Sequence, residues 1–151
     1  MLRHDIAVLG AVAALFLCPA AMPALAADAP TVSQVLTDVD KLLKENPMPA
    51  GATSQLIKIA EDPTVSVYLT TTLPGASLAP HVHKSHDETE YVIRGTGRLF
   101  VNGEWADMGP GSVHFNPMGK VHGAINNGKE PLVVLIMFTP AMTETDRHFV
   151  K

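Results

Sequence analysis

Apolar residues recur at helical spacing in the segment from residue 31 to residue 46. Thr31 can cap the N-terminus of a helix, and Gln34 three residues later completes a capping box. The helix should end at Asn46, because Pro47 disfavours a helical conformation in the residue before it. One face collects the apolar positions Val32, Val35, Leu36, Val39, Leu42 and Leu43. The polar face carries charges of both signs, so we expect an amphipathic helix that packs on the barrel exterior or against a partner subunit and not against a membrane.

From residue 51 onward the pattern changes to short segments typical of β-strands, in which β-branched and aromatic residues stand between turn residues. Asn102-Gly103 is a strong hairpin signal, because both positions of the favoured two-residue turn require positive φ. The last apolar run, LVVLIMF, has no alternation and predicts a strand buried on both faces. Outside the motifs described below, strands are expected at residues 55–60, 65–73, 98–101, 104–108 and 132–138. Their regular spacing indicates an all-β barrel or sandwich.

The first 26 residues have the layout of a cleavable secretory signal peptide. Arg3 precedes an apolar run from residue 6 to residue 17, and Ala24-Leu25-Ala26 is typical of a cleavage site. An apolar run of this length is too short to span a bilayer. We expect cleavage after Ala26 or Ala27 and a periplasmic or secreted protein without membrane contact. The alternatives are an uncleaved anchor and a lipoprotein attached through Cys18.

Length and composition set bounds on the mature protein. The chain of 151 residues fits one domain, with residues 27–50 as a lead and helix and residues 51–151 as the barrel. Eleven basic against fifteen acidic residues argue against a nucleic-acid partner. The single cysteine lies in the predicted signal peptide, so the mature fold depends on its core and not on a disulfide. The side chains expected in that core include Tyr91, Phe100, Trp105, Phe115 and Met137.

Two histidines one residue apart, His81 and His83, give the first indication of chemistry. On an extended strand both imidazoles leave from the same face and can converge on one point. The polar stretch at residues 84–87 allows the chain to turn, so Glu88 at the start of the next strand can add a carboxylate. A pair of strand histidines is more often a surface or hydrogen-bonded feature than a metal site, so the pair by itself decides nothing.

A second stretch, GSVHFNPMGKVHGAIN, begins at Gly111 and supplies a strand, a turn at residues 117–119 and then His122. Together the two stretches resemble the signature motifs of the cupin superfamily, G-x5-H-x-H-x4-E-x6-G and G-x5-P-x-G-x2-H-x3-N. All the fixed positions are filled, by Gly75, His81, His83, Glu88, Gly95, Gly111, Pro117, Gly119, His122 and Asn126. The resemblance implies a cupin double-stranded β-helix, a jelly-roll barrel, and it implies one metal ion held by His81, His83, Glu88 and His122.

Three neutral imidazoles and one carboxylate suit a divalent transition metal better than magnesium or calcium. The resemblance implies manganese or iron, whereas the affinity order that an exported protein meets favours copper or zinc, and nickel is also compatible. Four protein ligands on an octahedral ion leave two positions open. We therefore expect an enzyme of the oxygenase, decarboxylase or isomerase type that acts on a small polar molecule. The alternatives are a barrel that captures a small ligand or the metal without chemistry, and a structural barrel with a vestigial site.

Two other polar residues near the motifs are candidates for catalysis. Glu90 shares a strand face with Glu88 and could accept a proton, or it could pair with Arg94 or Arg98. His86 lies in the turn between the predicted ligands. It could meet a ligand at the barrel mouth, although a side chain that faces water is the simpler expectation.

The sequence leaves three further features open. Strand alternation does not show which face His114 takes, and His148 near the C-terminus is expected to be solvated. The polar tail at residues 139–151 could cover one end of the barrel. Sheet edges need cover, and small cupins resemble one another in forming dimers, so we expect a homodimer.

Overall fold

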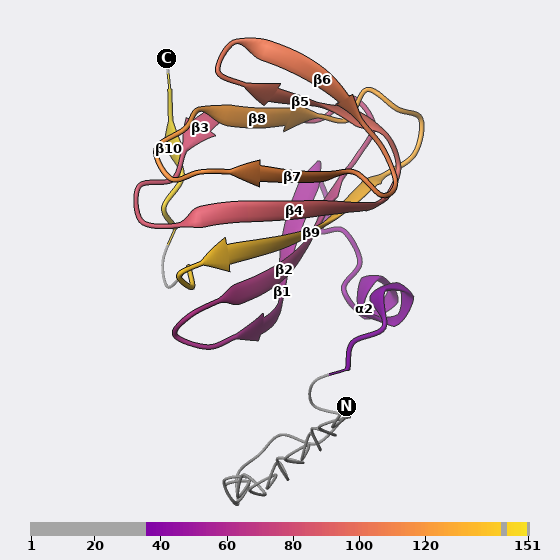
Figure 1. Ribbon diagram of the computed structural model, residues 1–151. Helices are drawn as coiled ribbons and strands as arrows, with labels where there is room; N and C mark the ends of the chain where they lie inside the picture. The colour runs from indigo at the N-terminus through magenta and orange to yellow at the C-terminus, as the bar shows by residue number, and fades with distance from the viewer. Residues whose placement is uncertain (1–35, 143–144, 151) are drawn as a thin grey trace, which may run out of the picture. The chain divides into compact units, whose positions relative to one another are not determined.

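Two antiparallel β-sheets of five strands each form the protein in a computed structural model that describes residues 36–142 and 145–150 (Figure 1). One sheet contains, in spatial order, β1 (Ser54–Glu61), β2 (Ser66–Thr72), β9 (Leu132–Thr139), β4 (Asp87–Arg94) and β7 (Val113–Asn116). The other contains β10 (His148–Phe149), β3 (Ser77–Val82), β8 (His122–Ile125), β5 (Gly97–Val101) and β6 (Glu104–Met108). The predicted all-β class is confirmed. The predicted signal peptide, residues 1–26, lies outside the described residues.

The strand pairings are those of one long hairpin rolled up on itself. β2 pairs with β9, β3 with β8, β4 with β7 and β5 with β6. Successive strands of each arm alternate between the two sheets, which is the predicted jelly-roll arrangement. Asn102 and Gly103 form the tip of the hairpin with φ angles of 47° and 98°, as their sequence predicts. The pairing places β3 and β4, which carry the first motif, beside β8 and β7 of the second.

The core lies between the two sheets and is centred on β9. Side chains at even-numbered positions of β9 point into the barrel, where the Phe138 ring meets the Tyr68 ring edge to face at 5.7 Å. Val133 on the opposite face is also buried, and Leu135 and Met137 are partly buried. The strand therefore has cover on both faces, as the unbroken apolar run predicts. The buried cluster consists of Tyr68, Val92, Met108, Leu132, Val134, Ile136 and Phe138.

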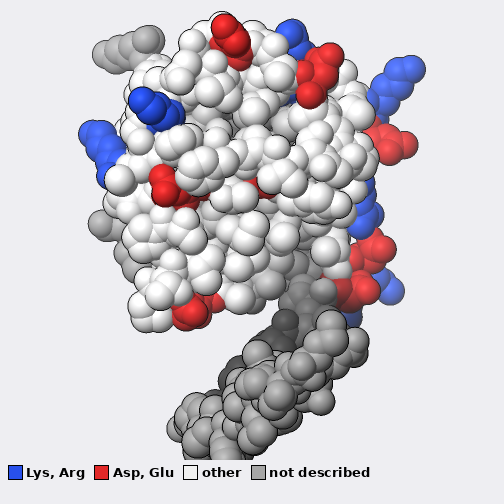
Figure 2. Space-filling model, in the orientation of Figure 1, with Lys and Arg blue, Asp and Glu red and all other residues white. Residues whose placement is uncertain are grey.

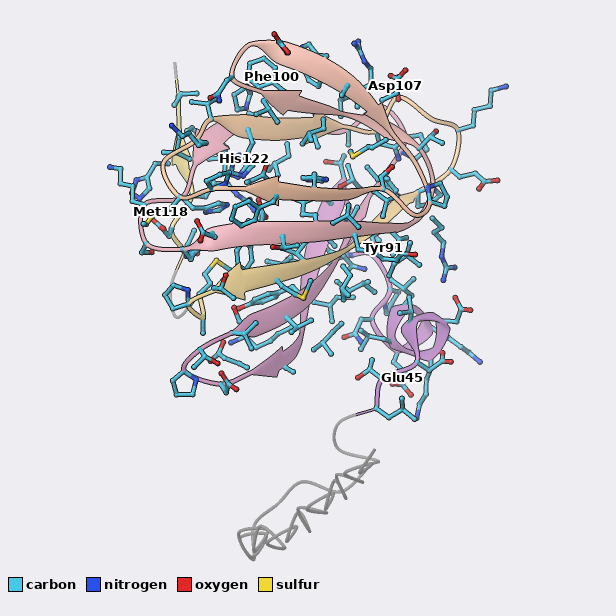
Figure 3. The ribbon with its side chains drawn as sticks, viewed as in Figure 1. Glu45, Tyr91, Phe100, Asp107, Met118 and His122 are labelled. Carbon is cyan, nitrogen blue, oxygen red and sulfur yellow. The ribbon has the colours of Figure 1, made fainter. Side chains whose placement is uncertain are left out.

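Several aromatic residues expected in the core lie outside it. Tyr91, Trp105 and Phe115 are 41%, 44% and 56% exposed, so these predictions are wrong. The inward positions of β4 are even-numbered, which turns Tyr91 outward, and the register pairs its neighbour Thr89 with Phe115 on the same outer face. Figure 3 shows Tyr91 among the side chains on the exterior of the barrel. Phe100 is only partly buried.

The helix begins later than its apolar spacing predicts. Helix α2 (Val39–Glu45) starts after Asp38, whose Oδ1 accepts a hydrogen bond of 2.8 Å from the Lys41 backbone N–H. An aspartate at this position is a strong N-cap, which explains why residues 36–38 lie outside the helix. The first part of the predicted helix, residues 31–35, lies outside the described residues. No helix in the described part of the chain is long and apolar enough to cross a membrane.

The contacts of α2 with the barrel are mainly polar. None of its residues is fully buried, so its packing role is weaker than the apolar face predicts. Arg94 of β4 forms a salt bridge with Asp40, and the Gln55 amide of β1 donates to the Asn46 carbonyl at 3.1 Å. Leu43 and Met48 share a shallow pocket with Val133 on the outer face of the sheet. This segment therefore covers part of the outer face of β9.

Candidate metal centre and cavity

Three of the four predicted metal ligands are histidines that β3 and β8 bring together. His81 of β3 lies directly opposite His122 of β8 in the strand register, and their ring centroids are 4.4 Å apart. His83 follows one residue after β3 ends and returns to the same face. All three side chains are at most 2% exposed. One ring nitrogen from each lies within 4.8 Å of the others, so this group could hold a metal ion.

Each of these imidazoles is fixed by a backbone carbonyl. Nδ1 lies 2.9 Å from the Ala79 carbonyl in His81, from the Asp146 carbonyl in His83 and from the Lys120 carbonyl in His122. Because a carbonyl oxygen only accepts, Nδ1 must carry the hydrogen, which leaves the lone pair of a neutral ring on Nε2. All three Nε2 atoms are buried; those of His81 and His83 have no hydrogen-bond partner, and that of His122 faces a carboxylate. Such unpartnered lone pairs are the donor set that a cation requires.

Glu88 supplies the carboxylate of the same cluster. Its Oε2 lies 2.8 Å from Nε2 of His122 and 3.7 Å from Nε2 of His83, and it accepts a hydrogen bond of 3.0 Å from the Asn116 amide. Asn116 stands directly opposite Glu88 in the register of β4 and β7. A carboxylate oxygen and an imidazole lone pair this close repel each other unless a positive charge lies between them. A proton or a metal ion can supply that charge.

The pKa values of the cluster residues are shifted in different directions. Burial lowers the pKa of His81 to about 4, and the charges of His122 and Arg147 add to that shift. Burial acts in the same direction on His122, but the neighbouring Glu88 outweighs it and raises the His122 pKa. Burial opposes the charged form of Glu88, yet the imidazoles of His122 and His83 outweigh burial and lower the Glu88 pKa. A proton bound to this cluster therefore belongs with His122 and Glu88.

A cavity of about 270 Å³ adjoins the cluster inside the barrel. Glu88 and Glu90 of β4 form part of its wall, and Arg147 of the C-terminal tail forms another part. Most of the remaining wall is apolar and comes from both sheets, with Leu78, Met108, Ala124, Leu132, Val134 and Ile136. The three histidines are not among the described residues that line the cavity, so a small molecule in it would meet the cluster through Glu88.

Glu90, one of the two catalytic candidates, lies on the cavity wall and pairs with His114. The register of β4 and β7 sets the two residues opposite each other, and His114 Nε2 lies 2.9 Å from Glu90 Oε2. Burial and the charge of Glu88 raise the Glu90 pKa. Glu90 pairs with neither of the arginines considered as its partners, because Arg94 pairs with Asp40 and Arg98 pairs with Asp107. His114 therefore points toward the interior of the barrel, which strand alternation in the sequence did not decide.

His86, the other catalytic candidate, is buried at 2% exposure and does not face water as expected. Its ring is 4.5 Å from the His83 ring and 4.8 Å from the Phe138 ring, centroid to centroid. It is absent from the described residues that line the cavity. The turn-like sequence around it did not reveal this burial, because the tail that covers the turn comes from the other end of the chain.

Asp146 is a residue of the site that the sequence did not reveal. Its side-chain Oδ2 accepts hydrogen bonds of 2.6–2.7 Å from the Ser85 hydroxyl and from the Lys84 and Ser85 backbone N–H groups. Its carbonyl also accepts the Nδ1 hydrogen of His83. His148, which is exposed as expected, lies 2.8 Å from the other carboxylate oxygen. No local signal marks a lone aspartate in a polar tail as the partner of a turn about sixty residues earlier.

The fold and the site together define a small jelly-roll barrel with a histidine-rich centre, and known proteins share this class. A family model of the cupin domain matches residues 68–138. An uncharacterized protein of Aquifex aeolicus is 33% identical over 74% of this chain and 88% of its own length. L-ectoine synthase of Bordetella avium is 35% identical over 55% of this chain and 63% of the synthase.

Solved structures agree with the sequence relatives. An uncharacterized conserved protein with a double-stranded β-helix domain from Klebsiella pneumoniae has a TM-score of 0.65 and 25% identity over 76% of this chain and 97% of that chain. The chain belongs to the cupin family, and some of its relatives are enzymes. It spans less than two thirds of the synthase.

Proposed function

We propose that the protein is a metal-dependent cupin enzyme that acts on a small polar molecule, with a reaction of the oxygenase, decarboxylase or isomerase type. The observation that carries this proposal is the set of three buried Nε2 atoms that converge beside Glu88, a residue of the cavity wall. A closed structural metal site would have no adjoining cavity for a ligand. We assign His81, His83, Glu88 and His122 as the residues that would hold the ion.

The surrounding residues would each contribute to such chemistry. A bound metal would act as a Lewis acid toward oxygen atoms of a ligand. The backbone carbonyls behind Nδ1 keep the rings oriented, and Asn116 keeps Glu88 in place. Glu90 on the wall can hold a proton to a higher pH than an ordinary glutamate, because its pKa is raised, and His114 can exchange that proton with it.

For the metal we propose manganese or iron, since the ligand set has no thiolate and includes a carboxylate. Nickel, zinc and copper bind the same donors, and a sample produced in a foreign host could contain them. Elemental analysis of protein purified from its own compartment identifies the ion.

Metal binding should depend on the four assigned residues. Replacement of His81 or His122 by alanine removes one of three imidazoles, so we expect metal content measured by plasma mass spectrometry to fall sharply. His148→Ala is the matched control, because His148 is exposed and its ring lies against Asp146 and not in the cluster. Equal metal loss in all three variants would contradict the assignment.

The reaction can be sought with a panel of diketones, hydroxy acids and thiols added to metal-loaded protein. Oxygen uptake indicates an oxygenase, release of carbon dioxide indicates a decarboxylase, and a shift in the ligand's NMR spectrum without either indicates an isomerase. Tight binding across the panel without turnover would favour the second candidate, a barrel that captures a ligand without chemistry. Glu90 at the cavity wall, with His114 paired to it, favours the enzyme.

We also propose that the protein works outside the cytoplasm, after removal of residues 1–26, and that it is a homodimer. The first proposal is supported by the signal-peptide pattern, and N-terminal sequencing of the exported protein tests it. The second is supported by exposed apolar side chains on the outer side of β4 and β7, among them Tyr91, Val113 and Phe115.

A further inference from the structure

Arg147 is the one lysine or arginine among the described residues that line the cavity. Its backbone is held on both sides. Asp146 before it is fastened to the turn at residues 84–85, and β10 after it pairs with β3, with His148 opposite Val82 and Phe149 opposite His81. These contacts fix the backbone on both sides of Arg147 and so hold the residue at the cavity wall.

The charge of Arg147 has no partner in the described part of the chain. Its Nε is buried without a hydrogen bond, and no described carboxylate lies within 4.0 Å of its guanidinium. The two acids of the cavity wall contact other groups, since Glu88 lies against His122 and Glu90 lies against His114. A partly buried guanidinium whose Nε has no partner is stabilised when an anion binds beside it.

We propose that Arg147 binds the carboxylate of a small carboxylic acid whose remaining oxygen atoms face Glu88, on the side of the cavity where the histidine cluster lies. Guanidinium and carboxylate form two parallel hydrogen bonds, which fixes the orientation of the acid as well as its charge. The inference rests on the proposed function, because it names the class of substrate for the same cavity. Arg147 is the residue that selects this class.

The size of the cavity limits the acid further. A volume of about 270 Å³ corresponds to about nine water molecules in the liquid. The acid should therefore have roughly that number of non-hydrogen atoms or fewer. A further oxygen donor is also needed besides the carboxylate, and small hydroxy acids and keto acids such as glycolate, lactate, pyruvate and malate meet both conditions.

The proposal is tested by calorimetric titration of manganese-loaded protein with glycolate, lactate, pyruvate and malate, each compared with its neutral amide. The amide has the same shape but lacks the charge that Arg147 would bind. We compare the unchanged protein with Arg147→Met, which keeps length and removes charge, and with Arg147→Lys. Arg94→Met is the control, because Arg94 lies on the exterior and pairs with Asp40. Metal content is measured on every sample.

The unchanged protein should bind at least one acid about tenfold or more tightly than its amide, consistent with one charge-assisted pair. Arg147→Met should lose that preference while its metal content and its affinity for the amide stay constant, and Arg147→Lys should keep part of it. Arg94→Met should behave as the unchanged protein. The proposal is overturned if no acid is preferred over its amide, if Arg147→Met retains the preference, or if Arg147→Met loses metal.

This readout is separate from turnover. Binding of an acid that depends on Arg147, without any reaction in the oxygen and carbon dioxide assays, keeps the inference and rejects the enzymatic proposal. Turnover of a neutral molecule that Arg147→Met does not affect keeps the enzymatic proposal and rejects the inference about Arg147.

Discussion

At the scale of single residues, the site depends on which nitrogen of each imidazole is left free. A backbone carbonyl at 2.9 Å fixes the hydrogen on Nδ1 of His81, His83 and His122. For His81 and His122 that carbonyl belongs to the residue two positions earlier, so the adjacent backbone orients the ring. For His83 it belongs to Asp146. The third ring is therefore the one whose orientation depends on the tail.

The lowered pKa of His81 predicts how the metal-free protein responds to acid. The folded state holds this pKa at about 4, whereas an exposed histidine in the unfolded chain titrates near 6.5. Between these values the unfolded chain binds a proton that the folded protein does not, so the free energy of unfolding falls as the pH is lowered. The effect is complete near pH 4.

Urea unfolding of metal-free protein at several pH values from 7 to 4 measures this change in the free energy of unfolding. His81→Asn is the reference, because asparagine does not titrate. The stability of the unchanged protein relative to the variant should decrease as the pH falls through this window. Parallel stability curves for the two proteins would show that His81 titrates normally in the fold.

At the scale of secondary-structure elements, the turns that bracket the first motif have different roles. Gly75 and Gly95 both have a φ of 79°, a conformation that favours glycine. A Cβ atom at Gly75 would meet nothing within 4 Å, whereas at Gly95 it would lie 2.8 Å from Cα of Leu132. Gly95 therefore permits a close approach between the end of β4 and the start of β9 as well as a turn.

Alanine substitutions separate these two roles. Gly75→Ala introduces only the left-handed backbone conformation, so we expect the free energy of unfolding to fall by about 1–2 kcal/mol. Gly95→Ala adds a collision with main-chain atoms and should cost about 1–3 kcal/mol more. Urea unfolding of both variants gives the comparison. Equal losses would mean that β9 can move away from residue 95 without cost.

The sequence predicts local features of this fold better than contacts between distant segments. Alternation, Asn102-Gly103 and the run at residues 132–138 identify the strands, because each signal is contained in a few neighbouring residues. The spacing of the motif residues identifies the residues that meet at the cluster. Tyr91 and Phe115 were misplaced because apolar character does not reveal which face of a strand is covered. Asp146 and Arg147 were missed because their partners are far away in the chain.

At the scale of the whole molecule, an apolar surface on the outer side of β4 and β7 supports the proposed homodimer. We define it by Tyr91, Val113, Phe115 and Met118, which are 41%, 66%, 56% and 53% exposed. On the face shown in Figure 2 the charged side chains lie mostly around the rim, and uncharged atoms fill the centre. A second copy carries the same formal net charge of −4, so two copies can approach best through an uncharged surface.

The edge position of β7 makes this surface suitable for self-association, because one side of that strand has no neighbouring strand in the described sheet. Phe115→Glu places a charge in the centre of the surface and should convert the dimer to a monomer in sedimentation velocity experiments. Leu36→Glu is the matched control, since Leu36 is 74% exposed and lies outside the surface. A dimer that survives Phe115→Glu must form elsewhere, and a monomeric unchanged protein would disprove the dimer.

The path of the tail has a consequence for the order in which the protein is made. The carbonyl that orients His83 belongs to Asp146, which follows every motif residue in the order of synthesis. A nascent chain that has just completed β9 already contains every motif residue, yet one ring is still free to rotate. The three-histidine arrangement is therefore complete only after the segment around Asp146 has been made and has docked against residues 84–85.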